Sequence, residues 1–131
     1  MTGTIVLLGA QPKETVRTQL AWADVFLHAA VSEGFCNAVI EAQAMGVPVV
    51  TSDADGLSEN VLDGITGFVV PRRNAAELAG KIEVLVKDPN LRHRMGLEGR
   101  DHAVANFGLK RLIEEFSNLY RWMLEPDLNN N

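Results

Sequence analysis

Short apolar runs alternate along the chain with segments whose apolar residues recur every three or four positions. Four runs, at residues 5–8, 25–28, 47–51 and 68–70, are almost continuously apolar and end at glycine, proline or polar residues. Such runs are typical of strands that are covered on both faces. Because helical patterns separate them, the chain is predicted to form a parallel sheet with helices on both sides.

The helical segments are marked by start and stop residues. Pro12 opens a predicted helix of about ten residues, Gly46 ends another, and Asn74 is a suitable N-cap for a third. After the first, the predicted helices cover residues 37–45, 58–62, 74–87, 91–106 and 109–124. Residues 1–124 are therefore expected to form one domain, followed by a disordered tail at residues 125–131.

Composition supports a single globular domain. A chain of 131 residues can bury about two-thirds of its unfolded surface. The 47% hydrophobic and 22% charged residues lie in the usual range of folded proteins. The formal net charge is -5 and the basic residues are scattered, so nucleic acid is not expected as a partner.

The sequence also indicates a cellular location. No apolar run approaches the ~18 residues of a membrane span, so no transmembrane segment is expected. The first residues lack the basic start of a signal peptide. Cys36 is the single cysteine, which excludes an internal disulfide and a zinc site built from several cysteines. We therefore expect a cytoplasmic protein.

The stretch at residues 32–46 combines the features of a ligand site. In parallel sheets the loops from strand to helix share the edge that binds ligands. Gly34 lets the backbone approach a ligand, and the helix beginning at Asn37 presents its first amides to an anion such as a diphosphate. Glu41 lies about one turn past Asn37 and can accept two hydrogen bonds from a vicinal diol, while Glu33 can reach a sugar. Together these residues suggest recognition of a sugar nucleotide.

Each of these residues also has a plainer interpretation. Glu33 and Glu41 can be surface charges that complement the helix dipole. Cys36 and Asn37 can serve as spacer and cap, and a nucleophilic Cys36 is disfavoured because no local histidine is arranged to activate it. His28 ends a predicted strand at the ligand edge, where it either bonds a sugar hydroxyl or is a half-buried histidine with satisfied polar atoms.

The other polar residues are interpreted as structural. Asp53 and Asp55 could hold a metal, but two carboxylates without further local ligands are more typical of a turn. Arg72 and Arg73 are interpreted as a solvated pair. Two histidines on a predicted polar helix are treated as surface residues, namely His93 and His102. No metal site is therefore predicted.

Residues 33–41 resemble the two-glutamate motif, Glu then seven residues then Glu, of the group 1 glycosyltransferases, the retaining family 4 enzymes of the GT-B fold. The resemblance continues through residues 23–28, 41–50, 56–61 and 63–71 and covers roughly residues 5–124. It implies a Rossmann-like three-layer α/β fold with a parallel sheet, as part of a GT-B C-terminal domain, with additional C-terminal helices.

The resemblance also assigns roles to residues. Glu33 would be the catalytic residue that faces the donor sugar near its reacting carbon, and Glu41 would hold the ribose hydroxyls. Gly34 and His28 would line the donor site, and the backbone of residues 35–37 (Phe35, Cys36 and Asn37) would meet sugar hydroxyls and diphosphate. The family transfers a hexosyl group from a nucleotide-diphosphate sugar with retention and without a required metal or other cofactor.

This sequence departs from the family in two ways. Cys36 and Asn37 replace a frequent Gly-Leu, and Ala29 and Ala30 replace a frequent Pro-Ser. The family's N-terminal acceptor domain and the Arg and Lys that contact the diphosphate would lie before Met1. The chain is therefore expected to be a C-terminal portion with little or no activity alone.

A partner is expected for the same reason. It would be the missing N-terminal domain, a separate subunit, or a second copy bound through the amphipathic helix at residues 109–124, unless that helix simply packs on the sheet. A non-catalytic interaction module that pairs with such a subunit is the competing interpretation. An epimerase of related fold is disfavoured by the spacing of the two glutamates.

Overall fold

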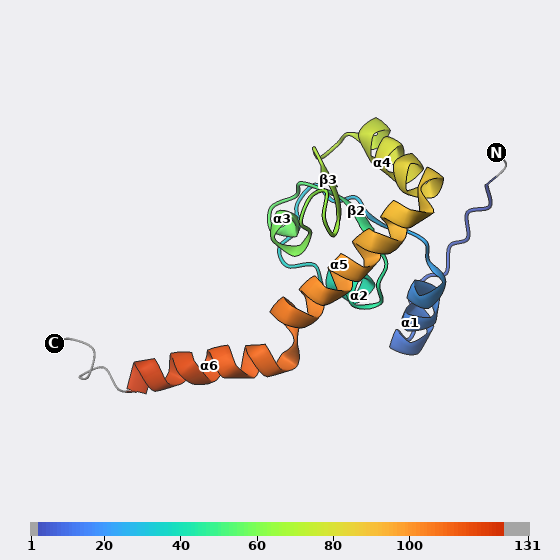
Figure 1. Cartoon of the computed structure of the whole chain (residues 1–131). Coiled ribbons are helices and arrows are strands. Elements are labelled where there is room, and N and C mark those ends of the chain that lie inside the picture. Colours follow the sequence, from blue (N-terminus) through green and yellow to red (C-terminus); the bar gives the residue numbers. More distant parts are fainter. Residues whose placement is uncertain (1–2, 125–131) are drawn as a thin grey trace.

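A computed structural model describes residues 3–124 (Figure 1). Within that range, three parallel strands form one sheet in the order β1 (Phe26–His28), β2 (Val49–Ser52) and β3 (Gly67–Val70). Phe26 pairs with Val49 and Val49 pairs with Gly67, so the first residues of the three strands are aligned in register. The predicted parallel α/β fold is confirmed.

All the predicted helices are present close to their expected limits. They are α1 (Lys13–Trp22), α2 (Asn37–Ala44), α3 (Leu57–Asn60), α4 (Ala75–Lys87), α5 (Pro89–Phe107) and α6 (Leu109–Leu124). The side chain of Asn74 accepts a hydrogen bond from the Glu77 amide and caps α4, as predicted. Gly46 ends α2 at φ 75°, a conformation that glycine adopts at little cost. The expected tail at residues 125–131 lies outside the described residues.

The prediction of a strand at residues 5–8 is wrong. This segment pairs with no strand in the described part of the chain, and Ile5 and Leu7 expose 89% and 92% of their surfaces. Figure 1 shows it running away from the sheet beyond α1. An apolar run indicates a preference for burial, but a strand forms only where a neighbouring strand supplies hydrogen bonds. The sheet therefore has three strands where the sequence suggested four.

The core consists of two apolar clusters, one on each face of β2. Val49 belongs to one cluster and the adjacent Val50 to the other, because successive strand residues point to opposite faces. The first cluster is formed mainly by Val39, Ala42, Val47, Leu57 and Val61, and the second by Val70, Leu78, Leu85 and Met95. All four residues of β2 are buried, including the polar Thr51 and Ser52, which explains why its sequence does not alternate between apolar and polar residues.

Helix α6 does not pack on the sheet. None of its residues is buried, and it extends away from the rest of the fold after a bend near Gly108 (Figure 1). Its apolar side chains are about half exposed or more, including Leu112 at 50%, Ile113 at 56% and Phe116 at 52%. The alternative in which this helix covers the sheet is therefore wrong. In the described range, no helix is both long and apolar enough to cross a membrane.

Close contact between α5 and the end of α2 depends on Gly96. A Cβ atom at this position would meet the carbonyl oxygen of Gly46, which is backbone and cannot rotate away. Gly80, in the exposed part of α4, has open space at the same position. We predict that Gly96→Ala lowers the free energy of unfolding by about 2 kcal/mol, because the two segments must separate.

Gly80→Ala is the matched control and is expected to raise the free energy of unfolding by about 0.5–1 kcal/mol through helix propensity. Urea unfolding followed by circular dichroism measures both changes. Equal effects of the two substitutions would show that the contact between α5 and α2 is not tight.

Candidate functional site

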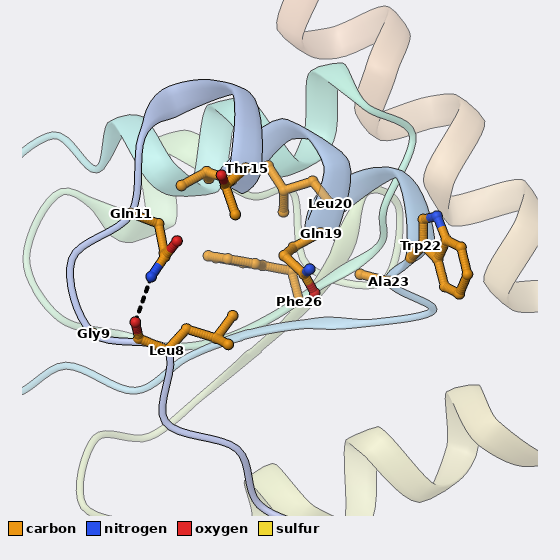
Figure 2. A pocket seen from close by; sticks show the side chains of 10 residues that line it. Leu8, Gly9, Gln11, Thr15, Gln19, Leu20, Trp22, Ala23 and Phe26 are labelled. Atoms are coloured by element: carbon orange, nitrogen blue, oxygen red, sulfur yellow. Dashed lines mark hydrogen bonds between the residues drawn. The ribbon is translucent and has the colours of Figure 1, made fainter.

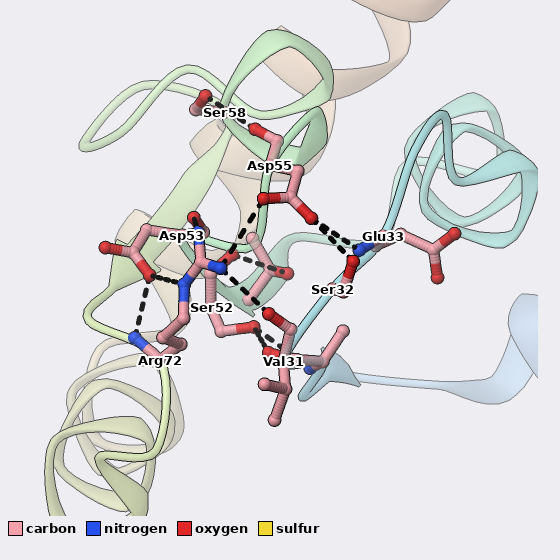
Figure 3. A network of polar contacts seen from close by, with 10 residues as sticks. Val31, Ser32, Glu33, Ser52, Asp53, Asp55, Ser58 and Arg72 are labelled. Atoms are coloured by element: carbon pink, nitrogen blue, oxygen red, sulfur yellow. Dashed lines mark hydrogen bonds and ion pairs between the residues drawn. The ribbon is translucent and has the colours of Figure 1, made fainter.

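The loops that follow the three strands meet at the carboxyl edge of the sheet, where Arg72 joins them (Figure 3). Its Nη1 donates to the carbonyl of Val31 at 2.9 Å, after β1, and its Nη2 donates to the carbonyl of Asp53 at 2.7 Å, after β2. Its Nε lies 3.2 Å from the Asp53 carboxylate, and its Nη1 lies 3.5 Å from that of Asp55. Arg72 is exposed, as expected of a solvated residue, with 39% of its side chain in solvent, and it also bonds to its neighbours. Arg72 is a bridge between loops.

Asp55 holds the backbone of Glu33. Its Oδ2 accepts hydrogen bonds from the Ser32 hydroxyl at 2.8 Å and from the Glu33 amide at 3.2 Å. The Glu33 carbonyl in turn accepts from the Gly56 amide at 3.1 Å. Asp55 is a turn residue, as expected, with φ 37°, and it also fixes the loop after β1. The Glu33 side chain is thus anchored at its base.

The two aspartates are held in their ionised forms. A hydrogen bond from the Arg72 amide is the main cause that lowers the pKa of Asp53, and the Arg72 guanidinium adds to it. The Ser32 hydroxyl, followed by the Glu33 amide, lowers the pKa of Asp55. Each cause requires the loops to be in place, so loop structure and ionisation are coupled.

His28, Glu33 and Cys36 come together at this edge. The Nε2 atom of His28 lies 3.2 Å from a carboxylate oxygen of Glu33 and 3.6 Å from the sulfur of Cys36. The side chains of His28 and Glu33 are 26% and 32% exposed, and Cys36 is buried. The expectation that no histidine lies near Cys36 is therefore wrong. The carboxyl end of β1 and the start of α2 meet in space although eight positions separate the two residues.

The start of α2 is held by Asn60, which the sequence analysis did not single out. Asn60 is completely buried, and its Oδ1 accepts a hydrogen bond from the Cys36 amide at 3.2 Å. Cys36 is the N-cap residue and Asn37 is the first residue of the helix, so the interpretation of Asn37 as the cap is wrong. A polar residue between Leu57 and Val61, both buried, was the available signal, because buried amides normally have partners.

Glu41 lies apart from this cluster, over a hollow between α1 and α2. The hollow has a volume of about 330 Å³, and its polar lining includes Glu41, Lys13 and Arg17. Its apolar lining comes from Val16, Leu20, Ala44 and Met45. Both basic residues belong to a helix outside the stretch at residues 32–46, so the pattern of that stretch did not point to them.

A second hollow adjoins the first on α1 (Figure 2). It has a volume of about 490 Å³ and is mainly apolar. Leu8, Gln11, Gln19, Leu20 and Phe26 are among the residues that line it. Gln11, Val16 and Leu20 line both hollows, so the two lie next to each other along α1, and Glu41 lines only the first.

The remaining predicted residues lie on the surface or near it. Gly34 is exposed, and Phe35 is 54% exposed with its ring edge against that of Phe107 at a centroid distance of 5.3 Å. His93 is exposed as expected. His102 is half-buried and stacks edge-on to Phe107, which corrects its assignment to the surface.

Comparison with known proteins identifies the family of this fold. The family model for glycosyl transferases group 1 matches residues 2–102, which is most of the chain. The chain belongs to the group 1 glycosyltransferases. The predicted resemblance is thereby confirmed.

Two curated relatives of this group 1 glycosyltransferase chain are themselves glycosyltransferases. It is 37% identical over 102 residues to the capsular polysaccharide biosynthesis glycosyltransferase CapM of Staphylococcus aureus, with 78% of this chain and 27% of that protein covered. It is 42% identical over 89 residues to the D-inositol 3-phosphate glycosyltransferase of an Arthrobacter strain, with 68% and 21% covered. The chain spans about a quarter of the length of these relatives.

Solved structures of the GT-B fold superpose well. Sucrose-phosphate synthase from Thermosynechococcus elongatus matches with a TM-score of 0.85 and 29% identity, over 92% of this chain and 30% of that one. Anabaena Alr3699/HepE, solved in complex with UDP-glucose, matches with a TM-score of 0.77 and 23% identity, over 81% and 29%. Because HepE is only 23% identical to this chain, the similarity between them shows the shared fold alone.

Removal of the Arg72 side chain tests its role in joining the loops. We predict that Arg72→Ala speeds amide hydrogen exchange at residues 31–34 by about fivefold, because the loop loses its tie to the other two strand ends. Arg73→Ala, at the adjacent exposed position, is the control and should leave this exchange unchanged. Mass spectrometry on peptides from this loop measures the exchange. Equal exchange rates in the two variants would contradict the bridging role of Arg72.

Acid should weaken the same network. Both aspartates have a pKa below the ordinary value of 3.8, so ionisation stabilises the fold above about that pH, and the contribution is lost as pH falls through the lower folded values. We predict that Asp53→Asn/Asp55→Asn melts at a lower temperature than the parent at about pH 6 and that the difference narrows below about pH 4. Thermal unfolding at several pH values measures this. A difference that stays constant would contradict it.

Proposed function

We propose that this chain provides the nucleotide-sugar-binding part of a retaining glycosyltransferase. The enzyme would transfer a hexosyl group from a nucleotide-diphosphate sugar to an acceptor glycan or small molecule. The single observation that carries the proposal is the placement of the two motif glutamates, Glu33 anchored before α2 and Glu41 on α2 over a hollow. Family membership supports it, as does the UDP-glucose complex of the structural neighbour HepE.

Glu33 is the proposed catalytic residue. Its backbone is held at both its amide and its carbonyl, while its carboxylate remains 32% exposed and able to contact a ligand. A carboxylate beside the reacting carbon of a sugar stabilises the positive charge that develops there during transfer. His28, 3.2 Å from this carboxylate, orients it and is itself placed to bond a sugar hydroxyl.

The start of α2 is the proposed contact for sugar hydroxyls and diphosphate. Gly34 is exposed and offers backbone without a side chain, and helix amides at an N-terminus favour anions. The Cys36 amide is already used by Asn60, so the amides of Phe35 and Asn37 are the ones assigned to the donor. Cys36, as the N-cap residue of α2, lies between these two amides and is proposed to line the site.

Glu41 and the hollow beside it are the proposed nucleoside site. A volume of about 330 Å³ falls within the usual size of small-molecule sites. Its apolar lining suits a base, and the Glu41 carboxylate can accept two hydrogen bonds from ribose hydroxyls. Lys13 and Arg17 line the same hollow and supply positive charge beside a negatively charged donor.

Transfer is proposed to need no metal or other cofactor, but it needs more than this chain provides. Charge that builds on a leaving diphosphate must be stabilised. Arg72 is already engaged with Asp53 and Asp55, and Lys13 and Arg17 line the nucleoside hollow beside Glu41, not the start of α2 where the diphosphate is proposed to bind. We therefore propose that the chain alone has little or no activity and that an N-terminal domain or separate subunit completes the site. A cytoplasmic location, where nucleotide sugars are available, is part of the proposal.

A second candidate function is that of an interaction module that pairs with another polypeptide. The exposed apolar face of α6 favours it, since contiguous apolar surface of this kind usually contacts a partner. The two candidates differ in whether the chain binds a nucleotide sugar by itself.

Donor binding is tested by removing the Glu41 carboxylate. We predict that Glu41→Gln weakens binding of a nucleotide-diphosphate sugar at least about tenfold, because charged hydrogen bonds to the ribose are lost. Glu59→Gln, at an exposed position on α3, is the control and should bind like the parent. Isothermal titration with UDP, GDP and ADP sugars measures the affinities. Tight binding that Glu41→Gln leaves unchanged would contradict the assignment of Glu41 to the ribose.

The partner surface is tested by its effect on oligomeric state. We predict that the chain self-associates through α6 as concentration rises and that Leu112→Ser/Phe116→Ser remains monomeric, because the apolar face is lost. Glu114→Ser/Asn118→Ser alters exposed polar residues of the same helix and should associate like the parent. Light scattering across a concentration series distinguishes them. A parent chain that stays monomeric throughout would contradict a homodimer.

A further inference from the structure

We propose that His28, Glu33 and Cys36 form a binding site for a single Zn²⁺ ion. These are three different kinds of zinc ligand: an imidazole, a carboxylate and a thiol. One potential ligand atom from each lies within 4.8 Å of the other two. The ion at this site would not be a catalytic cofactor, because the proposed sugar transfer does not use a metal.

The interatomic distances match those of a tetrahedral zinc site. Zinc lies about 2.3 Å from sulfur and about 2.0–2.2 Å from nitrogen and oxygen, so its sulfur and nitrogen ligands are about 3.6 Å apart and nitrogen and oxygen about 3.4 Å apart. The corresponding separations here are 3.6 Å from His28 Nε2 to Cys36 Sγ and 3.2 Å from that nitrogen to Glu33 Oε2. Two of the three edges are therefore in place. The third edge, between sulfur and carboxylate, is no longer than 4.8 Å, and rotation of the partly exposed Glu33 side chain would adjust it.

The backbone under each ligand is held by a different neighbour. Thr51 donates to the His28 carbonyl at 2.9 Å, Asp55 accepts from the Glu33 amide, and Asn60 accepts from the Cys36 amide. The ligands therefore need no loop rearrangement to converge, which reduces the cost of binding an ion.

The chemistry of the three ligands selects zinc over harder cations. Thiolate and imidazole are favoured by Zn²⁺, whereas Mg²⁺ and Ca²⁺ prefer oxygen ligands. On binding, the Cys36 thiol releases its proton to solvent, and the resulting thiolate and the Glu33 carboxylate balance the charge of the ion. Three protein ligands leave the fourth tetrahedral position for water.

Zinc at this site would block the donor. Glu33 cannot ligate zinc and face a donor sugar at the same time, so the ion and the nucleotide sugar exclude each other. This consequence rests on the proposed function, whereas the metal site itself does not. Zinc would then act as an inhibitor that is sensitive to the state of the Cys36 thiol.

Metal titration of the full chain without any nucleotide tests the site. We expect saturable binding of one Zn²⁺ by calorimetry, and with Co²⁺ as probe a thiolate-to-metal charge-transfer absorption. Cys36→Ser, Glu33→Gln and His28→Ala should each weaken Zn²⁺ binding at least about tenfold, and Cys36→Ser should abolish the Co²⁺ band. His93→Ala, at an exposed histidine on α5, is the matched control and should bind like the parent.

Circular dichroism confirms that each variant is folded, and Glu33→Gln, at a partly exposed side chain, keeps the test valid if Cys36→Ser unfolds. Absence of saturable zinc uptake, or uptake that folded Glu33→Gln retains in full, overturns the site.

The donor titration is then repeated with Zn²⁺ present. Weaker donor binding in the parent, with no such effect in Cys36→Ser, supports exclusion, and simultaneous binding overturns it. Because the first titration contains no nucleotide, failure of the metal site and failure of donor binding are distinguishable.

Discussion

The arrangement of the site depends on the hydrogen bonds and ion pairs of the Arg72 guanidinium. This group contacts the loops after β1 and β2 from its own position after β3, so one side chain connects the ends of all three strands (Figure 3). Beyond the strands only a few other hydrogen bonds of the described residues join these loops, among them the bond from the Asp53 amide to the Val70 carbonyl at 2.8 Å. A planar group with several donors in a fixed geometry can align the loops, which a lysine ammonium could not do in the same way.

This bridge separates a fixed backbone from side chains that remain available. Asp55, which Arg72 contacts, holds the Glu33 amide, and Asn60 holds the Cys36 amide. The backbone of Gly34 also packs so closely on Gly56 that a Cβ atom on Gly56 would overlap it. Rigid support under partly exposed side chains is the arrangement that a binding site requires. It explains how a histidine, a carboxylate and a thiol can converge at one edge of the sheet.

Apolar surface is distributed unevenly over the fold. The two faces of β2 are fully covered, whereas α6, Trp22 and residues 5–8 leave large side chains in contact with solvent. The chain corresponds to about a quarter of the length of its relatives. Large exposed apolar faces are typical of contact surfaces in general. Val31 and Phe35, at 50% and 54% exposure, add apolar surface beside Glu33.

The helices and most of the strands were predictable from the sequence because their signals are local. The apolar run of β2, the Asn74 cap, Gly46 and the apolar stripe of α6 each act over a few residues, and the expected helices and parallel sheet are present. The two-glutamate spacing was also local, and the family it indicated is confirmed. The same reasoning failed at residues 5–8, where the outcome depends on whether a neighbouring strand is present.

Only the tertiary structure decided which distant residues meet. Nothing in the spacing of Arg72 and Val31 shows that they are hydrogen-bonded, and nothing in a lone Cys36 shows that His28 lies 3.6 Å from its sulfur. Such pairs are set by the order in which parallel strands bring their loops to one edge. Strand order is a property of the packed sheet and is not encoded in any single segment.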